Sequence, residues 1–212
     1  MKVVNIISGK DLGGPKQSFI DYGTMLTNLG LEVHYIVRPK AKCLEYLSHI
    51  PSKQVHIINY YRSNIKFIKK HSIKKLTKTL NLIEPKIIFA HKQFDLSLLK
   101  PAYPQAYLIG IIHGFNARHT NNADQLIAVS SAVTNWLKNK TKTPCLTIAN
   151  TVSLPKQEIA KKNKTITIGT MAVFRRKKQI NHLIKAASIL KNQGLNFNII
   201  IAGRGFRRHW FL

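Results

Sequence analysis

Short apolar runs alternate with helical periodicity along most of the chain. The runs have the length of buried strands and occupy 2–8, 31–37, 54–60, 85–91, 106–114, 125–130, 145–150, 165–171 and 196–203. Between them, apolar residues recur at helical spacing in 16–29, 62–84, 131–139 and 180–195, and 42–50 reads as a short helix. Strands that alternate with helices predict parallel βαβ units and a doubly wound α/β sheet. The helix at 16–29 would be the crossover that makes the first two strands parallel.

The same pattern predicts how the chain is divided. Residues 1–150 contain a full doubly wound domain, and the polar segment 151–164, with Pro155, is typical of an inter-domain linker. Residues 165–203 supply only strand, basic loop, helix and strand, which is the beginning of a second domain. The tail at 204–212 is rich in arginine and changes composition abruptly. We therefore expect an incomplete second domain followed by an aberrant tail, as a frameshift would produce.

The charge of the chain is strongly positive, with 34 Lys+Arg against 8 Asp+Glu and a formal net charge of +26. Such a field favours phosphate-bearing ligands, anionic lipid surfaces or nucleic acid, although a general abundance of lysine would give the same excess. Nucleic-acid binding ranks last, because basic residues are not interleaved with stacking aromatics and no recognised motif is present. The lysine-rich helix at 62–84 predicts weak, salt-sensitive contact with anionic membranes. The alternative is an ordinary helix whose apolar stripe packs on the sheet; that stripe consists of Ile65, Ile68, Ile73, Leu76, Leu80 and Ile83.

Other features of the sequence bound the location and the cofactors. No apolar run is long enough to cross a bilayer, and the first ten residues do not resemble a signal peptide. Cys43 and Cys145 are far apart and are expected to be reduced, as in a cytoplasmic protein. No Cys or His spacing suits a metal, so no metal site and no cofactor are expected.

In a doubly wound sheet, ligands bind beyond the carboxyl ends of the strands. Residues that could contact a ligand follow several predicted strands, namely Gly13, Gly14, His91, His113, Ser130 and Asn150. A glycine pair before a helix allows a phosphate to approach free backbone N–H groups, although an ordinary tight turn gives the same pattern. The spacing is not G-x-G-x-x-G and Arg38 follows the second strand, so a nicotinamide dinucleotide site is not predicted.

Two further groups suggest polar or anionic ligands. His113 ends an apolar strand and precedes Gly114, so its ring could bond a polar ligand or could be structural. Four cations, Arg175, Arg176, Lys177 and Lys178, precede the helix of the second domain. Cations at that place oppose the helix dipole unless an anion binds, which favours a phosphate site over a solvated charge run.

Taken in order, six segments of the chain resemble the retaining glycosyltransferases of family four, which have the two-domain GT-B fold. The segments are GKDLGGPKQSFIDYGTMLTNLGLEVHYIV, PKIIFAH, IGIIHGFNARH, ADQLIAVSSAVTNWL, LTIANTV and IGTMAVFRRKKQINHLIKAASIL, together spanning roughly 3–203. The stretch at 113–119, HGFNARH, is most similar to members that act on lipopolysaccharide core. The resemblance implies a GT-B-like fold, with one complete Rossmann-like acceptor-side domain, 1–150, and part of a donor-binding domain, 165–203.

The resemblance also implies roles for particular residues. His113 would be catalytic and contact the transferred sugar, and Gly13 and Gly14 would lie near the donor diphosphate. Lys178, with an arginine, would neutralise the departing diphosphate, which is the main electrostatic task in such chemistry. Contacts from His91, Ser130 and Asn150 are further candidates. The family generally needs no metal; its donor is a nucleotide-sugar.

The chain also departs from the family pattern. Val173 stands where the family has an arginine, so Arg175 or Arg176 would have to substitute, and Gln179 replaces a glycine. No glutamate follows Glu158, so the paired glutamates of the family are missing. The expected function is sugar transfer from a nucleotide-sugar to a lipopolysaccharide or envelope glycan acceptor, by an incomplete copy that is weakly active or inactive. The alternative is a non-catalytic basic protein that binds anionic membrane surfaces, peripheral to the inner face of the cytoplasmic membrane.

Overall fold

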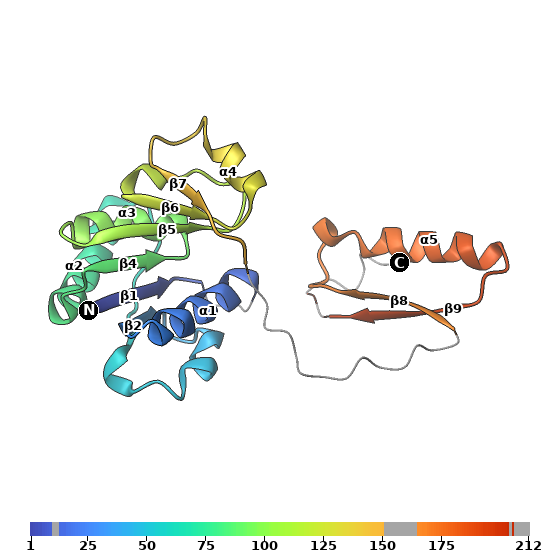
Figure 1. Cartoon of the computed structure of the whole chain (residues 1–212), viewed down its shortest axis with the longest axis horizontal. Coiled ribbons are helices and arrows are strands. Elements are labelled where there is room, and N and C mark those ends of the chain that lie inside the picture. The colour runs from blue at the N-terminus through green and yellow to red at the C-terminus, as the bar shows by residue number, and fades with distance from the viewer. Residues whose placement is uncertain (10–12, 151–164, 204, 206–212) are drawn as a thin grey trace. The chain divides into compact units, whose positions relative to one another are not determined.

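The chain divides into two compact units, Met1–Val152 and Ser153–Leu212. The computed structural model describes residues 1–9, 13–150, 165–203 and 205. Figure 1 shows the first unit in blue to yellow and the second in orange to red. The predicted linker at 151–164 lies outside the described residues, as does the predicted tail except for Gly205.

A seven-stranded parallel sheet forms the first unit, with the strand order β3-β2-β1-β4-β5-β6-β7. Its strands are β1 (Lys2–Ile7), β2 (Glu32–Val37), β3 (Val55–Ile57), β4 (Ile87–Ala90), β5 (Tyr107–Ile112), β6 (Gln125–Ala128) and β7 (Cys145–Thr147). β1 pairs in parallel with both β2 and β4, so the predicted doubly wound α/β fold is confirmed. The chain winds from β1 to one side and then, from β4, to the other. The switch between β1 and β4 is where such sheets leave a crevice for ligands.

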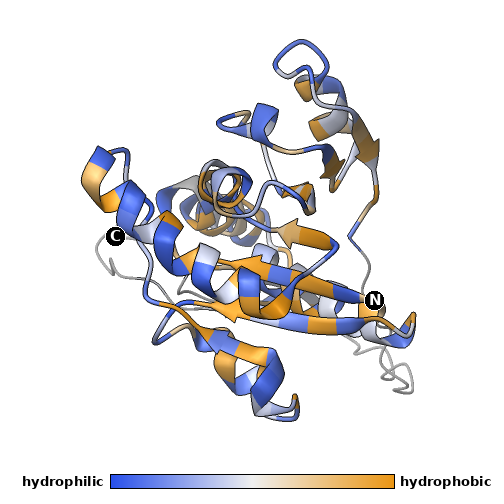
Figure 2. Cartoon of the chain, turned by 90° about the vertical axis from the view of Figure 1, so that its left-hand side faces the viewer, coloured by the Kyte–Doolittle hydropathy of each residue, from blue (hydrophilic) through white to orange (hydrophobic). Residues whose placement is uncertain are grey.

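Helices cover both faces of this sheet, and each face has its own apolar core. One core joins the strands to α1 (Gly14–Asn28), through residues such as Phe19 and Leu26. The other joins them to α2 (Lys66–Ile83), α3 (Gln93–Ala102) and α4 (Ser131–Leu137). In Figure 2 the strands of this sheet are mostly orange, whereas the helices carry both orange and blue residues. The buried strands therefore supply the core and the amphipathic helices shield it.

Local signals in the sequence set most helix ends. Pro15 lies in the first turn of α1, and Gly30, at φ 75°, follows its last turn. Ser130 caps α4, because its Oγ accepts a hydrogen bond from the Val133 N–H at 3.3 Å. Glu84 ends α2 in the left-handed conformation, directly before Pro85.

The structure corrects several predicted boundaries. The strand expected at 54–60 is only β3, and the short helix expected at 42–50 is a 3-10 helix, Lys42–Leu47. α2 begins at Lys66 rather than at 62, and Ile65, which was expected in its buried stripe, is 64% exposed. α3 was not predicted. Residues 95–99 in α3 are all buried, Asp95 and Ser97 among them, and Pro101, a residue that normally breaks a helix, lies inside it.

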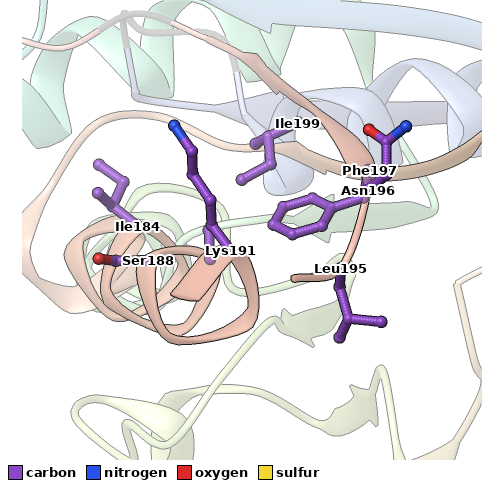
Figure 3. A pocket seen from close by; sticks show the side chains of 8 residues that line it. Ile184, Ser188, Lys191, Leu195, Asn196, Phe197 and Ile199 are labelled. Carbon is purple, nitrogen blue, oxygen red and sulfur yellow. The ribbon is translucent and has the colours of Figure 1, made fainter. Parts of the chain in front are cut away.

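The second unit has two parallel strands, β8 (Ile166–Met171) and β9 (Phe197–Ala202), joined by α5 (Ile180–Asn192). This agrees with the strand, helix and strand expected from the sequence. α5 lies against β9 around a shallow pocket of about 450 Å³, where Ile184 and Lys191 of the helix face Phe197 and Ile199 of the strand (Figure 3).

Candidate functional site

Two histidines lie together at the carboxyl edge of the seven-stranded sheet. His91 follows β4 and His113 follows β5, and these strands are neighbours. Nδ1 of His91 is 3.3 Å from Nε2 of His113, and the rings stack with centroids 5.5 Å apart and planes 21° apart. The structure thus brings together two residues that the sequence placed at this edge.

A hydrogen-bonded chain behind the pair fixes which nitrogens carry protons. The side-chain amide of Asn5 donates to the Phe19 carbonyl at 2.7 Å, so its Oδ1 must accept from Nε2–H of His91 at 2.9 Å. Nδ1 of a neutral His91 is then an acceptor and receives Nε2–H of His113. His113 is left with Nδ1 as a lone-pair acceptor, and no described residue is paired with that nitrogen. The edge therefore presents a hydrogen-bond acceptor to a ligand.

Both imidazoles are held in the neutral form that this chain requires. Burial, and then the charges of His113, Lys92 and Lys16, place the pKa of His91 well below its ordinary 6.5. Burial, reinforced by the charge of Lys92, lowers the pKa of His113 to about 4. The rings of Phe19 and Tyr22 meet His91 edge-on, at centroid distances of 5.6 and 5.3 Å, and so contribute to its burial.

A buried carboxylate lies at the same edge. Asp95, at the start of α3, accepts the backbone N–H of Ser8, which follows β1, at 3.1 Å. Burial raises the pKa of Asp95 to about 6, although its hydrogen bond from the Ser8 N–H and the charges of Arg62 and Lys92 oppose the rise. Ser8 Oγ, Tyr60 OH and Asp95 Oδ1 are buried, and none has a hydrogen-bond partner among the described residues. These groups line the switch between β1 and β4 with polar atoms.

Cations outnumber the carboxylate at this edge. Lys16 is only 2% exposed, and its Nζ donates to the Cys43 Sγ at 3.2 Å rather than to a carboxylate. Burial, then the charge of Arg62, lowers the pKa of Lys92, although Asp95 opposes this. Three cations close to one carboxylate make the edge a favourable place for an anion.

The glycine pair begins α1 at this edge, but no described residue requires glycine there. A Cβ atom at Gly13 or Gly14 would meet no atom of the described residues within 4 Å. The Gly13 carbonyl accepts the Lys16 N–H at 2.8 Å, and both glycines are exposed. The proposed diphosphate role of the pair therefore remains a prediction.

The remaining predicted site residues are more dispersed. Ser130 is engaged as the cap of α4, and Asn150 is exposed after β7. Arg175, Arg176 and Lys178 belong to the second unit, where they form a 3-10 turn before α5 and are exposed. Their proposed contact with phosphate is untested by this structure.

Two residues of the site that the prediction missed had recognisable signals in the sequence. Asn5 is a polar residue inside an otherwise apolar strand, and Asp95 is one of only 8 acidic residues in the chain. A buried polar group must be hydrogen-bonded, so a polar residue in a core strand indicates a partner nearby. Lys16 and Lys92 gave no such signal, because lysine is common throughout the sequence.

Two findings limit the chemistry of the described residues. Within them, no group of three or more His, Cys, Asp or Glu side chains is arranged to hold a metal ion. None of the helices formed by these residues is both long and apolar enough to cross a membrane.

No protein-family profile matches the chain, and no curated protein matches its sequence. Solved structures do match its fold. HepE from Anabaena, in complex with UDP and glucose, has a TM-score of 0.73 at 16% identity, covering 97% of this chain and 62% of HepE. A glycosyltransferase from Rickettsia africae has a TM-score of 0.70 at 14% identity, covering 96% and 68%.

The lipopolysaccharide outer core galactosyltransferase WaaB has a TM-score of 0.66 at 13% identity, covering 99% of this chain and 70% of WaaB. The chain thus spans 62 to 70% of the length of these three structures. At such low identity the likeness concerns the fold alone. The expectation of a GT-B-like fold is confirmed, and the chain has the architecture of the Rossmann-like domains of GT-B glycosyltransferases.

Proposed function

We propose that the chain belongs to a glycosyltransferase that moves a sugar from a nucleotide-sugar to a lipopolysaccharide or envelope glycan acceptor. The observation that carries the proposal is the chain from Asn5 through His91 to His113, at the switch edge of a GT-B-like sheet. It leaves one acceptor nitrogen on His113, with fixed tautomer, at the edge where such sheets bind ligands. Structural neighbours solved with UDP and with UDP-glucose support a nucleotide-sugar as the donor, and WaaB supports the acceptor class.

Each group at the edge then has a defined task. A hydroxyl of the transferred sugar donates to Nδ1 of His113, which holds the sugar in one orientation. The N–H groups at the start of α1, next to Gly13 and Gly14, and the nearby cations Lys16 and Lys92 offset negative charge on the donor. In the second unit, Arg175, Arg176 and Lys178 bind the diphosphate as it leaves, without a metal. His91, Ser130 and Asn150 are secondary contacts.

The finer assignment, to the retaining enzymes of family four, is part of this proposal. We expect little transfer from the chain as given, because Val173 occupies the place of an arginine that binds the donor in that family. In other enzymes, removing one hydrogen-bond donor that stabilises a developing anion lowers the rate about 100- to 1,000-fold. The described part of the loop after β8 offers Arg175 and Arg176 as the nearest replacements.

We also propose a peripheral contact between α2 and the inner, cytoplasmic face of an anionic membrane, where a glycolipid acceptor would be found. Ile65 and Phe67 are 64% and 80% exposed at the start of α2, close to the lysines of its outer face. Each lysine near an anionic surface contributes about 1 kcal/mol. Liposome sedimentation tests the contact: equal binding to neutral and anionic vesicles would refute it.

Donor binding at the histidine pair is the most direct test of the proposed function. The ring signals of the nine histidines can be followed by NMR while UDP-glucose is added to the full chain. We expect the His113 signal to shift when UDP-glucose binds. The variant His113→Ala should bind UDP-glucose about tenfold more weakly, because one hydrogen bond and the positioning that it provides are lost. His49→Ala, an exposed histidine away from this edge, should bind as the unaltered chain does.

A folded chain that shows no change at His113 with UDP-glucose or with a panel of other nucleotide-sugars would contradict the proposal. A second assay uses labelled nucleotide-sugars with lipopolysaccharide-core acceptors. Transfer well above background, abolished in His113→Ala, would support the reaction and overturn the expectation of a weak or inactive chain.

A further inference from the structure

A second concave site lies at the same edge of the sheet, two strands from the histidines. It is a pocket of about 520 Å³, formed where β2 and β3 end and α2 begins. Its lining residues are Arg38, Tyr61, Arg62, Ser63, Phe67, Ile68 and His71. The site described above involves only Arg62 of these residues, as one of the three cations near Asp95.

Two arginines give this pocket its charge. Lysine is abundant everywhere in the chain, but only eight residues are arginine, and two of those eight line this one pocket. Arg38 stacks over the ring of Tyr61, with its guanidinium carbon 5.5 Å from the ring centroid. Its Nε is buried and has no hydrogen-bond partner among the described residues. The stacked guanidinium is held in one place with donors unsatisfied, which suits a planar or tetrahedral oxyanion.

Carboxylates within the described residues do not neutralise these arginines. The salt bridges there join His34 to Glu32 and Lys100 to Asp124. Arg62 acts electrostatically on Asp95, but Lys92 acts on the same carboxylate. The pocket therefore keeps a positive charge that an anionic ligand can balance.

The opposite wall is apolar and aromatic. Phe67 is 80% exposed and Tyr61 is 46% exposed, and both line the pocket. An exposed aromatic side chain beside the arginines gives the pocket a surface on which a ring or hydrocarbon can pack. The ligand is therefore expected to be amphipathic, with an anionic group and a ring or apolar part attached to it.

We infer that this pocket binds the anionic group of the acceptor, a phosphate ester or carboxylate, with Arg38 and Arg62 on its oxygens and Phe67 against the adjoining sugar ring or apolar moiety. The assignment to the acceptor rests on the proposed function. Its geometry agrees, because all strands of the sheet are parallel and so end at the same edge as the histidine pair. Arg62 also acts electrostatically on both Asp95 and Lys92, which lie at that edge.

Phenyl phosphate is a suitable probe, because it carries both features of the inferred ligand. Its binding to the full chain is compared with that of inorganic phosphate and of phenol, with the His71 ring signal as the NMR readout. We expect phenyl phosphate to bind most tightly, and Arg62→Met or Arg38→Met to weaken it at least about tenfold. Arg62→Lys should restore binding in part, since lysine keeps the charge without the fork of donors.

Lys74→Met is the matched control, because it removes one exposed cation of α2 that does not line the pocket. If Lys74→Met weakens phenyl phosphate binding as much as the arginine variants do, the binding depends on the overall positive charge and not on the pocket, and the inference is overturned. Unchanged binding of phenyl phosphate in Arg62→Met would also overturn the inference. Arg62 is exposed, so Arg62→Met is expected to fold and tests the pocket even if Arg38→Met does not fold. Phe67→Ala should weaken phenyl phosphate and leave inorganic phosphate unaffected.

Vesicles distinguish the source of the anion. Phosphatidylglycerol vesicles that bind in an Arg62-dependent manner and compete with phenyl phosphate would support a lipid-linked acceptor in the pocket. Binding to vesicles alone, with none to phenyl phosphate, would overturn the pocket in favour of a surface contact. Titration of UDP-glucose into the same samples separates this inference from the proposed function. If phenyl phosphate binds but UDP-glucose changes no signal, the proposed glycosyltransferase function is refuted and the anion pocket remains.

Discussion

Ile88 and Ile200 lie in parallel strands of similar composition, one in each unit, but their surroundings differ. Ile88, in β4, is 1% exposed, whereas Ile200, in β9, is 58% exposed. β4 has a paired strand on each side and a helical layer on each face. β9 pairs with β8 in a two-stranded sheet, and its described surroundings cover one face only in part. An apolar strand pattern therefore indicates the strand but not the layers that cover it.

The polar residues of the two units differ in the same way. In the first unit, buried polar side chains such as Asn5, His91 and Asp95 are fixed by hydrogen bonds. In the second, Arg175 and Lys178 are exposed on a turn. A preorganised site needs side chains whose orientation is locked by their neighbours. The described residues supply that support to the histidine pair, which is why the first unit carries the stronger functional hypothesis.

The same truncation in both units gives the largest expected difference. Ile88→Ala should lower the free energy of unfolding by about 2–5 kcal/mol, because the side chain is removed from a packed core. Ile200→Ala should change it by about 0.5 kcal/mol or less, as is usual for exposed side chains. Hydrogen exchange of peptides from β4 and from β9 measures the two units separately. An equal loss in both would show that Ile200 is covered in solution and would break the comparison.

Asp95 should make the stability of the first unit depend on pH. Its folded pKa, about 6, lies above the ordinary 3.8, so between these values the folded chain holds a proton that the unfolded chain has lost. The stabilisation from that proton is complete below about pH 3.8 and is lost as the pH rises to about 6. A shift of two pKa units corresponds to about 3 kcal/mol. Asp95→Asn should remove this loss.

His113 has the opposite effect on stability. Its folded pKa, about 4, is below the ordinary 6.5, so stability falls as the pH is lowered through this range. In the unaltered chain the two effects partly cancel, whereas Asp95→Asn should show a clear rise in stability between pH 4 and 6.5. Urea unfolding at several pH values tests this, with Lys191→Met of the second unit as control. Parallel pH profiles for Asp95→Asn and the unaltered chain would mean that the carboxylate is not buried.

Replacing a strand glycine with alanine should lower the free energy of unfolding in the first unit and raise it in the second. A Cβ at Gly110, in β5, would lie 3.0 Å from Leu126 and 3.1 Å from Leu96, both fully buried. Overpacking of this kind costs about 1–3 kcal/mol. A Cβ at Gly169, in β8, meets nothing within 4 Å, and Gly169→Ala should stabilise by about 0.4–1 kcal/mol through the unfolded chain. Stabilisation by Gly110→Ala would show that the first core has spare room.

Most of the fold could be predicted from periodicity and turn residues. The parallel pairing of β1 and β2 follows from the helix predicted at 16–29, and the order of strands and helices follows from the apolar pattern. α3 was not predicted: it is only 10 residues long and contains Pro101, which normally breaks a helix. The exposed start of α2 was also missed, since Ile65 was expected in the stripe that packs on the sheet.

The candidate site could be predicted only in outline. The rule that ligands bind at the carboxyl edge placed His91 and His113 together, and the structure shows them in contact. The partners Asn5 and Asp95 are separated from His91 and Ser8 by more than eighty residues, so no local pattern relates them. The tautomer of His113 depends on that long-range chain of hydrogen bonds. Sequence therefore locates candidate groups, and tertiary packing determines what they present to a ligand.

The smallest expected effect concerns a surface ion pair of the first unit. Lys100 Nζ lies 2.7 Å from Asp124 Oδ1, and the side chains are 35% and 30% exposed. Asp124 also accepts the Leu108 N–H at 2.8 Å, so it joins α3 to the start of β5. Lys100→Met should cost about 0.5 kcal/mol, since partly exposed pairs are screened. The loss should shrink further in high salt, because added ions weaken the pair.

The matched change in the second unit is Lys191→Met. Lys191, at the end of α5, forms no salt bridge with a described carboxylate, so its loss should be neutral, apart from a few tenths of a kcal/mol from the helix dipole. A urea titration at low and at high salt compares the two variants. A larger loss for Lys191→Met than for Lys100→Met would mean that isolated cations hold the second unit together more firmly than a paired cation holds the first. The conclusion that charged side chains are fixed by partners in the first unit but not in the second would then be wrong, whereas the difference in core burial would still hold.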